Sequence, residues 1–277
     1  MSSQPPNPFQ APGEMPRPAA GVGLQSLPVN LGPAPPPFQG MDYQRSYKFI
    51  FEHTNWLVNV ALVFVCQFII PIVGPIVCLG YFGEMIEHLH QRNPRGPYPN
   101  FDFGRFGDYL KRGIWPFLAA VVGSMILVPV IFAVIFVMGA IPALVGENGR
   151  ESGLIVGAIF MVMMVLYFAI IILLNVFLVP ILLAAELTQE FAAAFNFNWI
   201  LDFLRRVWKE LLLSAMFLTV TALGLTFVGA LLCCVGIYPL TTLIFFAQTH
   251  LYYQLYELYL ARGGQPLAIK TQLPPVL

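Results

Sequence analysis

The sequence predicts an all-α, polytopic transmembrane helix bundle, made of a short proline-broken hairpin, four longer spans and two cytoplasmic amphipathic surface helices. Of the 277 residues, 58% are hydrophobic and only 10% are charged, and the mean hydropathy is +0.74. Soluble domains contain roughly 25% charged residues, so a water-facing surface cannot be built from this composition. Long apolar runs without Lys or Arg recur along the chain. Together these observations predict that the helices lie in lipid.

Four of the apolar runs are long enough to cross a bilayer. A helix rises ~1.5 Å per residue, so about 20 apolar residues cross ~30 Å of hydrocarbon while their backbone groups pair within the helix. The four runs are Ile114–Val145, Leu154–Leu183, Leu211–Cys234 and Ile237–Leu260. We expect one spanning helix in each.

The first apolar run, Trp56–Leu89, is interrupted by Pro71, Gly74 and Pro75. Proline and glycine favour a turn at this point, and proline also lacks an amide donor. We therefore expect two short helices joined by a turn. The first arm would extend roughly 22 Å at helical rise, which is less than the ~30 Å thickness of the hydrocarbon. The turn is a candidate re-entrant element inside the membrane.

Basic residues predict the orientation, because cytoplasmic loops retain Lys and Arg. Every basic group except Arg150 can be assigned to one side of the predicted spans. We expect a multi-pass protein of the inner (cytoplasmic) membrane with both termini in the cytoplasm.

The composition of residues 1–42 predicts a disordered, Pro-rich cytoplasmic tail, since 11 prolines fall in the first 40 residues. Residues 43–262 form the predicted transmembrane domain, and residues 263–277 a short cytoplasmic tail.

A spaced pattern occurs twice, 94 residues apart. The first copy is Phe101-Asp102-Phe103 with Asp108-Tyr109-Leu110-Lys111-Arg112, and the second is Phe195-Asn196-Phe197 with Asp202-Phe203-Leu204-Arg205-Arg206. Each copy precedes a predicted span, and its apolar residues recur at helical spacing. The pattern predicts a duplicated unit of surface helix and span. The alternative is that any helix entering the membrane needs such flanking residues, which explains the composition but not the matched Phe-x-Phe and Asp positions.

The two surface helices are expected to lie on the cytoplasmic leaflet with their apolar faces toward the lipid. Their basic groups would then face anionic headgroups. Membrane lipids are therefore the partners we expect. The candidate lipid-facing residues are Lys111, Arg112, Arg205, Arg206 and Lys209.

Polar groups near or within the apolar runs form a candidate intramembrane site, because polar side chains at that depth usually face the bundle interior and mark function. The members are Glu84, His88, Gln248, His250 and Gln254. Glu84 and His88 are four residues apart and share a helix face. An ordinary helix end and interhelical hydrogen bonds that fix packing remain the alternatives. The turn formed by Pro71, Gly74 and Pro75 is a second candidate, since broken helices often line substrate sites.

Catalytic, cofactor and nucleic-acid signatures are missing from the sequence. There is no Gly-x-Ser-x-Gly, Walker A or His-Glu-x-x-His motif, and the Glu87-x-x-His90 pattern has no second copy as a di-iron bundle requires. The net charge of zero argues against a nucleic-acid partner. We expect no catalytic residue, no cofactor and no metal.

The four cysteines lie in apolar runs without Cys-x-x-Cys spacing, so we interpret them as small hydrophobic residues. They are Cys66, Cys78, Cys233 and Cys234.

An ordered series of motifs runs through residues 44–262. It comprises Asn55-Trp56, Ile70-Pro71-Ile72-Val73-Gly74-Pro75, Leu79-Gly80-Tyr81, Asp102-Phe103-Gly104 and Lys111-Arg112-Gly113. The series resembles the prokaryotic multi-pass membrane family catalogued as domain of unknown function 4013. The resemblance implies a multi-pass membrane protein without an assigned activity, and it supplies no catalytic residues.

The sequence is compatible with three functions. The leading hypothesis is a non-enzymatic scaffold that organises partners or lipids at the inner leaflet, based on the paired basic surface helices. The second is a small permease or channel with a site at the broken hairpin and the last span. The third is a membrane-embedded metal enzyme that uses His88 and His90.

Overall fold

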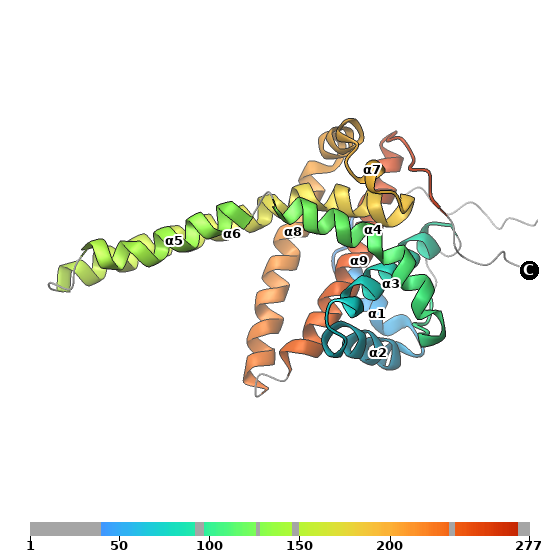
Figure 1. Ribbon diagram of the computed structural model, residues 1–277, viewed down its shortest axis with the longest axis horizontal. Coiled ribbons are helices and arrows are strands. Elements are labelled where there is room, and N and C mark those ends of the chain that lie inside the picture. The colour runs from blue at the N-terminus through green and yellow to red at the C-terminus, as the bar shows by residue number, and fades with distance from the viewer. Residues whose placement is uncertain (1–39, 92–96, 126–127, 146–149, 233–235, 271–277) are drawn as a thin grey trace, which may run out of the picture. The chain divides into compact units, whose positions relative to one another are not determined.

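The computed structural model describes residues 40–91, 97–125, 128–145, 150–232 and 236–270 (Figure 1). Over these ranges the chain is helical and contains no strand, which confirms the predicted all-α class. The predicted N-terminal tail up to residue 39 lies outside the described residues, as do Cys233 and Cys234. The elements are α1 Arg45–Glu52, α2 Trp56–Ile69, α3 Val73–Gln91, η1 Phe103–Arg105, α4 Phe106–Met125, α5 Val128–Val145, α6 Arg150–Thr188, α7 Phe191–Ala194, α8 Phe197–Leu231 and α9 Ile237–Ala261.

Among the described residues, two helices are long and apolar enough to cross a membrane. They are Gly157–Thr188, within α6, and Phe197–Leu231, which is α8. The α1–α2 pair, bent by 105°, would be a third if it forms one broken span. This supports a membrane protein, but the predicted four longer spans are not confirmed. The last predicted span, in α9, buries most of its side chains from Thr249 to Tyr259 inside the protein.

The predicted span Ile114–Val145 is divided in the structure. Helix α4 ends at Met125 and α5 begins at Val128, with two residues between them outside the described part. Helix α4 also begins at Phe106, so the first predicted surface helix and the start of the span form one continuous helix. No turn or cap residue separates the two segments in this copy, and a distinct first surface helix is therefore not confirmed.

The hairpin between α2 and α3 turns where its prolines predict. Helix α2 ends at Ile69, Ile72 adopts a left-handed φ of 65°, and α3 starts at Val73. Pro71 lies in the turn, while Gly74 and Pro75 fall in the first turn of α3. A proline is tolerated there because the first amides of a helix have no intrahelical partner. Whether the turn lies inside the membrane stays a prediction.

Helix α3 occupies the centre of the buried core and packs against α2, α4, α6 and α9. Its backbone comes closest to α4 at Gly80 and Gly113. A Cβ at Gly80 would lie 1.9 Å from the Tyr109 carbonyl oxygen, and one at Gly113 would lie 1.7 Å from that of Ile76. Only glycine fits at such an approach. The two helices are therefore in direct backbone contact.

The two copies of the repeated pattern begin with similar polar caps. Asp102 accepts a hydrogen bond from the Gly104 amide at 2.8 Å before η1, and Asn196 accepts one from the Trp199 amide at 3.3 Å before α8. Helix α8 then loses helical geometry at Val207 (φ −127°, ψ 17°). The residues before Val207 correspond to the second predicted surface helix. Duplication of the unit remains a prediction.

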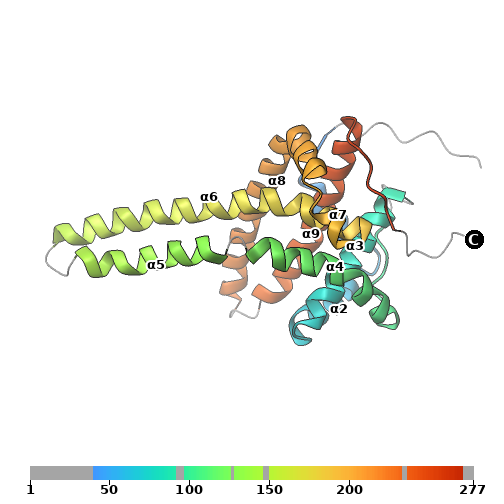
Figure 2. The ribbon, with the colours of Figure 1, turned by 45° about the horizontal axis from the view of Figure 1, so that its top comes forward.

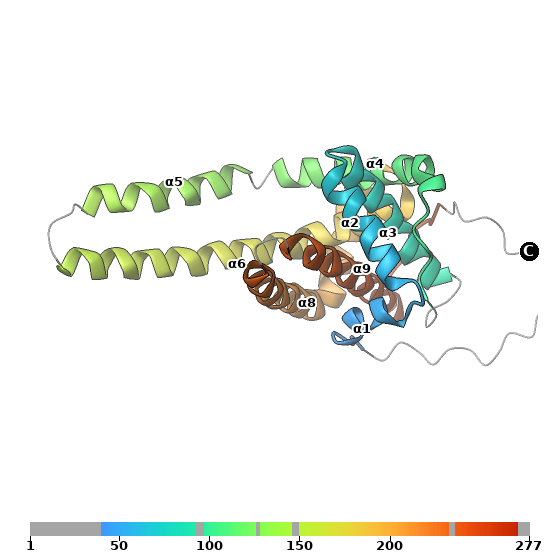
Figure 3. The ribbon, with the colours of Figure 1, turned by 90° about the horizontal axis from the view of Figure 1, so that it is seen from below.

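Helices α5 and α6 lie side by side (Figures 2 and 3). Their large apolar side chains are mostly exposed, and Phe136 reaches 76%. Most of this hairpin therefore lacks a covering element within the described chain. By contrast, the segment after α9 folds back onto α6, where the Lys270 amide donates to the Leu187 carbonyl at 3.0 Å.

Candidate functional site

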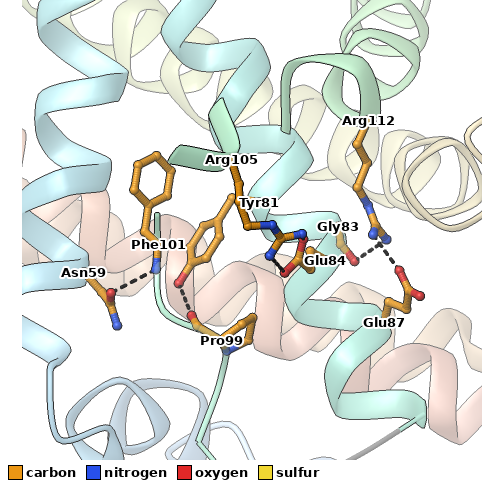
Figure 4. A network of polar contacts seen from close by, with 9 residues as sticks. All are labelled: Asn59, Tyr81, Gly83, Glu84, Glu87, Pro99, Phe101, Arg105 and Arg112. Atoms are coloured by element: carbon orange, nitrogen blue, oxygen red, sulfur yellow. Dashed lines mark hydrogen bonds and ion pairs between the residues drawn. The ribbon is translucent and has the colours of Figure 1, made fainter. Parts of the chain in front are cut away.

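A bidentate ion pair connects α3 to η1, directly before α4. Arg105 donates from Nη1 and Nη2 to the two carboxylate oxygens of Glu84 at 2.6 and 2.7 Å (Figure 4). Glu84 is buried and Arg105 is partly exposed. These hydrogen bonds raise the pKa of Arg105. Both oxygens of Glu84 are thus engaged by a residue outside α3.

The loop before η1 places Arg105 opposite Glu84. The Phe101 amide donates to the Asn59 side-chain oxygen at 3.0 Å, and the Tyr81 hydroxyl donates to the Pro99 carbonyl at 2.8 Å (Figure 4). The loop is therefore attached to α2 on one side and to α3 on the other. This attachment fixes where η1 begins.

A second ion pair lies deeper between α3 and α4. Arg112 donates from Nη1 to Glu87 Oε2 at 2.5 Å and from Nη2 to the Gly83 carbonyl at 2.8 Å. The side chains of Arg112 and Glu87 are 1% and 0% exposed. The prediction that Arg112 faces lipid headgroups is therefore wrong. Helical spacing placed it on the basic face, but α3 covers that position and supplies its counter-ion.

Glu186 of α6 lies beside this pair without a full set of partners. It is 3% exposed, and its Oε2 has no hydrogen-bond partner among the described residues. A Cβ at Gly83 would lie 3.1 Å from Arg112 Nε and 3.4 Å from Glu186 Cβ, so both side chains pack on the same stretch of α3. Glu87 Oε1 and Arg112 Nε are likewise buried and unpaired. The buried cluster thus contains two carboxylates and one guanidinium.

Glu186 also lines a cavity of about 240 Å³ between α2, α3, α6 and α9. Its other polar lining groups include Gln248, Thr249 and Tyr252 of α9, and Pro75 of the broken hairpin lies on its wall. The cavity therefore adjoins both the hairpin and the last helix, the two regions that the permease hypothesis named. Several lining residues, including Pro75 and Gln248, are only half-buried, so the cavity is not enclosed on all sides.

A second cavity of about 160 Å³ lies between α6, α8 and α9. It shares Gln248 and Tyr252 with the first and adds Asn175, Ser214 and Thr219. The Gln248 side-chain amide donates to the Tyr252 hydroxyl. This hydrogen-bonded pair thus faces both cavities.

His250 and Gln254 lie elsewhere on α9 and do not line either cavity. The ring of His250 stacks on Phe49 at 4.5 Å, and its Nδ1 is 2.9 Å from Gln254 Nε2. Gln254 accepts from the Asp42 amide at 2.7 Å and donates to the Asp42 carbonyl at 3.0 Å. These residues attach the start of the described chain to α9. The five predicted intramembrane polar residues therefore do not form one site, because they occupy different helix faces.

The end of α3 carries the two histidines that suggested a metal. His88 is half-buried. His90 Nδ1 lies 2.5 Å from Glu257 Oε1 of α9, so its partner is a single carboxylate on another helix. In the part of the chain that the structure describes, no group of three or more His, Cys, Asp or Glu side chains could hold a metal ion.

The remaining basic residues divide into exposed and paired groups. Lys111, Arg205 and Lys209 are exposed. Arg206 donates from Nε to Asp202 at 2.9 Å and from Nη1 to the Arg262 carbonyl at 2.5 Å. Lys111, Arg205 and Lys209, three of the five predicted lipid-facing cations, are therefore exposed and could contact a lipid headgroup.

Sequence reasoning missed Glu186 and Tyr252. Glu186 is the first acidic residue after the long apolar run of α6, and ionisable residues in that setting are candidate functional groups. That signal was present in the sequence. The neighbouring Glu87–Arg112 pair could not have been found from spacing, because its members belong to different helices.

Comparison with known proteins identifies a family but no activity. The family model described as Protein of unknown function (DUF4013) matches residues 63–234, more than half of the chain. The matched range includes both ion pairs and Glu186 but ends before α9. No curated protein and no solved structure matches the chain. The chain therefore belongs to the family of proteins of unknown function designated DUF4013.

Proposed function

We propose that this chain is an integral membrane protein that binds a small solute in the Glu186 cavity, in the manner of a small permease. One observation carries the proposal. Glu186 is almost fully buried and one of its carboxylate oxygens lacks a hydrogen-bond partner, and the residue lines a cavity whose wall includes the broken hairpin and α9.

The free-energy cost of burying the Glu186 carboxylate without a partner supports a functional reason for its position. An ionised or polar group that is buried without a partner destabilises a protein by several kcal/mol. Small-molecule sites are usually apolar cavities with a few convergent polar groups, and this cavity fits that description. Broken helices that line such a cavity are common in transporters. The multi-pass arrangement with cytoplasmic termini belongs to the same proposal.

Cavity blocking tests the proposal directly. The full chain in lipid nanodiscs is offered three probes of nearly equal shape: benzamidinium, benzamide and benzoate. Leu79 lines the cavity, so Leu79→Trp should fill it and lower the affinity of any bound probe at least about tenfold, because the added ring occupies the binding volume. Leu57→Trp, on the exposed face of α2, is the matched control and should bind normally.

Two results would count against solute binding. One is that none of the three probes binds to the native chain. The other is that Leu79→Trp binds as tightly as Leu57→Trp. If a probe binds, its flux into proteoliposomes then separates a permease from a binding protein.

A second candidate function, organisation of anionic lipids or of partners at the inner leaflet, rests on a different surface. On α8 the side chains of Phe197, Leu201 and Trp208 are exposed, and the cations Arg205 and Lys209 are exposed beside them. Lys209 Nζ lies 5.7 Å from the Trp208 ring centroid. An exposed apolar stripe flanked by cations is typical of helices that lie in the membrane interface.

Charge removal tests this second function. Each Lys or Arg near an anionic surface contributes about 1 kcal/mol, so Arg205→Gln with Lys209→Gln should lower phosphatidylglycerol enrichment about tenfold or more. The measurement is lipid retention in mixed nanodiscs by native mass spectrometry. Lys48→Gln with Lys270→Gln removes the same charge from other exposed sites and is the control. Equal retention by the two double variants would exclude a specific role for α8.

A further inference from the structure

We propose that the solute of the Glu186 cavity is a small organic cation, and that it binds in exchange for a proton carried by Glu186. This inference rests on the proposed function and adds the charge class of the ligand and the ion coupled to it. It follows from the charges of the buried cluster and from the residues that line the cavity.

The buried cluster contains one more acid than base. Glu87 and Glu186 are both buried, and Arg112 is the only buried cation between α3, α4 and α6 among the described residues. Arg112 is directly bound to Glu87. Lys111, next to Arg112 in the sequence, is exposed, and Arg105 is occupied by both oxygens of Glu84. The negative charge of Glu186 is thus not fully compensated by the protein.

An uncompensated carboxylate in a low-dielectric interior must be neutralised, either by a proton or by a cation. The proton can bind to the unpaired Oε2 of Glu186. A cation can reach the carboxylate through the adjoining cavity, since Glu186 is one of its lining residues. Binding is then an exchange in which the protonated carboxyl releases H⁺ to water and the carboxylate accepts hydrogen bonds from the cation. One positive charge leaves as one enters.

The cavity lining favours a cation over an anion. No Lys or Arg is among its lining residues, while Phe82, Phe245 and Tyr252 contribute aromatic rings. Aromatic faces attract organic cations through their negative quadrupole. A volume of about 240 Å³ accommodates a small organic molecule and not only a bare metal ion. An organic ammonium or amidinium meets both requirements.

Among the titratable groups around the cavity, Glu186 is the one that would exchange its proton for the cation. Arg112 of α4 and Tyr252 of α9 are the groups that interact with it electrostatically. A guanidinium group is not deprotonated in proteins. Helix α3 contributes Glu87, which is bound to Arg112, and the Cys78 thiol on the cavity wall. Helix α8, which also packs on α6, contributes Ser214 and Thr219 to the adjacent cavity, and neither titrates.

The experiment compares affinity and proton release for the full chain in nanodiscs. Benzamidinium should bind more tightly than benzamide and benzoate, and its binding in weakly buffered solution should release up to one proton per site. Its affinity should fall as the pH is lowered, because protons then compete for the carboxylate. Glu186→Gln should weaken benzamidinium binding about 100-fold and abolish the release, since the buried charge partner is lost. Glu190→Gln, at an exposed position four residues later, is the matched control and should behave as the native chain.

The outcomes separate the two proposals. Tightest binding by benzamide or benzoate, blocked by Leu79→Trp, would overturn the cation inference and leave solute binding intact. Benzamidinium binding without proton release by the native chain would overturn the exchange, even if Glu186→Gln fails to fold. Binding of benzamidinium that is equal in Glu186→Gln and Glu190→Gln would also overturn it. Failure of all three probes would remove the proposed function itself.

Discussion

The α3–α4 pair and the α5–α6 hairpin are both apolar helical pairs, yet they are stabilised by different surroundings. Residues 81–87 of α3 are all buried, and their carboxylates are paired with arginines. Helix α5 has no charged residue, and its central Phe136 is 76% exposed. Along this stretch α3 is covered by protein, whereas α5 requires lipid or another chain. Hydropathy alone cannot separate these cases.

Breaking the deep ion pair should give the largest effect on the protein-covered region. Arg112→Met would leave Glu87 buried and uncompensated, which costs about 3–5 kcal/mol of unfolding free energy. Chemical denaturation in micelles, followed by Trp fluorescence, measures the loss. The double variant Glu87→Leu with Arg112→Met should recover most of it. Lys111→Met, at the adjacent exposed position, should change stability little, and an equal loss there would contradict the role of the pair.

A charge in the middle of α5 tests whether lipid covers this exposed helix. Phe136→Arg should raise the apparent free energy of membrane insertion by about 2.5–3.5 kcal/mol, because a charged side chain would meet hydrocarbon. A glycosylation-based insertion assay measures the shift, with Phe136→Leu as the neutral control. Efficient insertion of the Arg variant would mean that α5 is not surrounded by lipid.

Separating α3 from α4 should have the next largest effect. Gly113→Ala would place a methyl group 1.7 Å from the Ile76 carbonyl oxygen. The helices must then move apart, and overpacking of this kind costs about 1–3 kcal/mol. Gly107→Ala on the same helix meets no atom within 4 Å and should be neutral or stabilising. Equal unfolding free energies for the two variants would argue against the close approach.

Releasing the start of the described chain should give the smallest effect. Gln254→Ala removes two hydrogen bonds to the Asp42 backbone, each contributing about 0.5–1.5 kcal/mol. Hydrogen exchange should become faster around Asp42 and α1 but not in α3. Gln248→Ala, whose side chain faces the cavities instead, should leave exchange at Asp42 unchanged.

The helical class and the broken hairpin were predictable because apolar length and proline act locally. The division between α4 and α5 also had a local signal, since Pro129 falls in the first turn of α5, and a helix usually stops before a proline. The burial of Arg112 was not predictable. Its position on the helix gives its face, but the identity of the covering helix depends on tertiary packing.

The candidate site was predictable only in part. The permease hypothesis named the broken hairpin and the last span together, and the structure brings Pro75 and Gln248 to one cavity. His250 and Gln254 were assigned to the same site as Gln248 because all three are polar residues in the last predicted span. A shift of two residues on a helix rotates the side chain by about 200°, and a shift of six by about 240°, so His250 contacts Phe49 of α1 and Gln254 contacts Asp42 instead.

The glycine contact between α3 and α4 limits how the protein can change shape. The backbones of α3 and α4 touch at Gly80 and Gly113, so no side chains lie between them there. One helix therefore cannot slide over the other by a rearrangement of side chains. We therefore expect α3 and α4 to move together as one rigid body. Relative motion would then take place at the interface of this pair with α6 and α9, where the Glu186 cavity lies. Rotation at that interface would open and close the cavity.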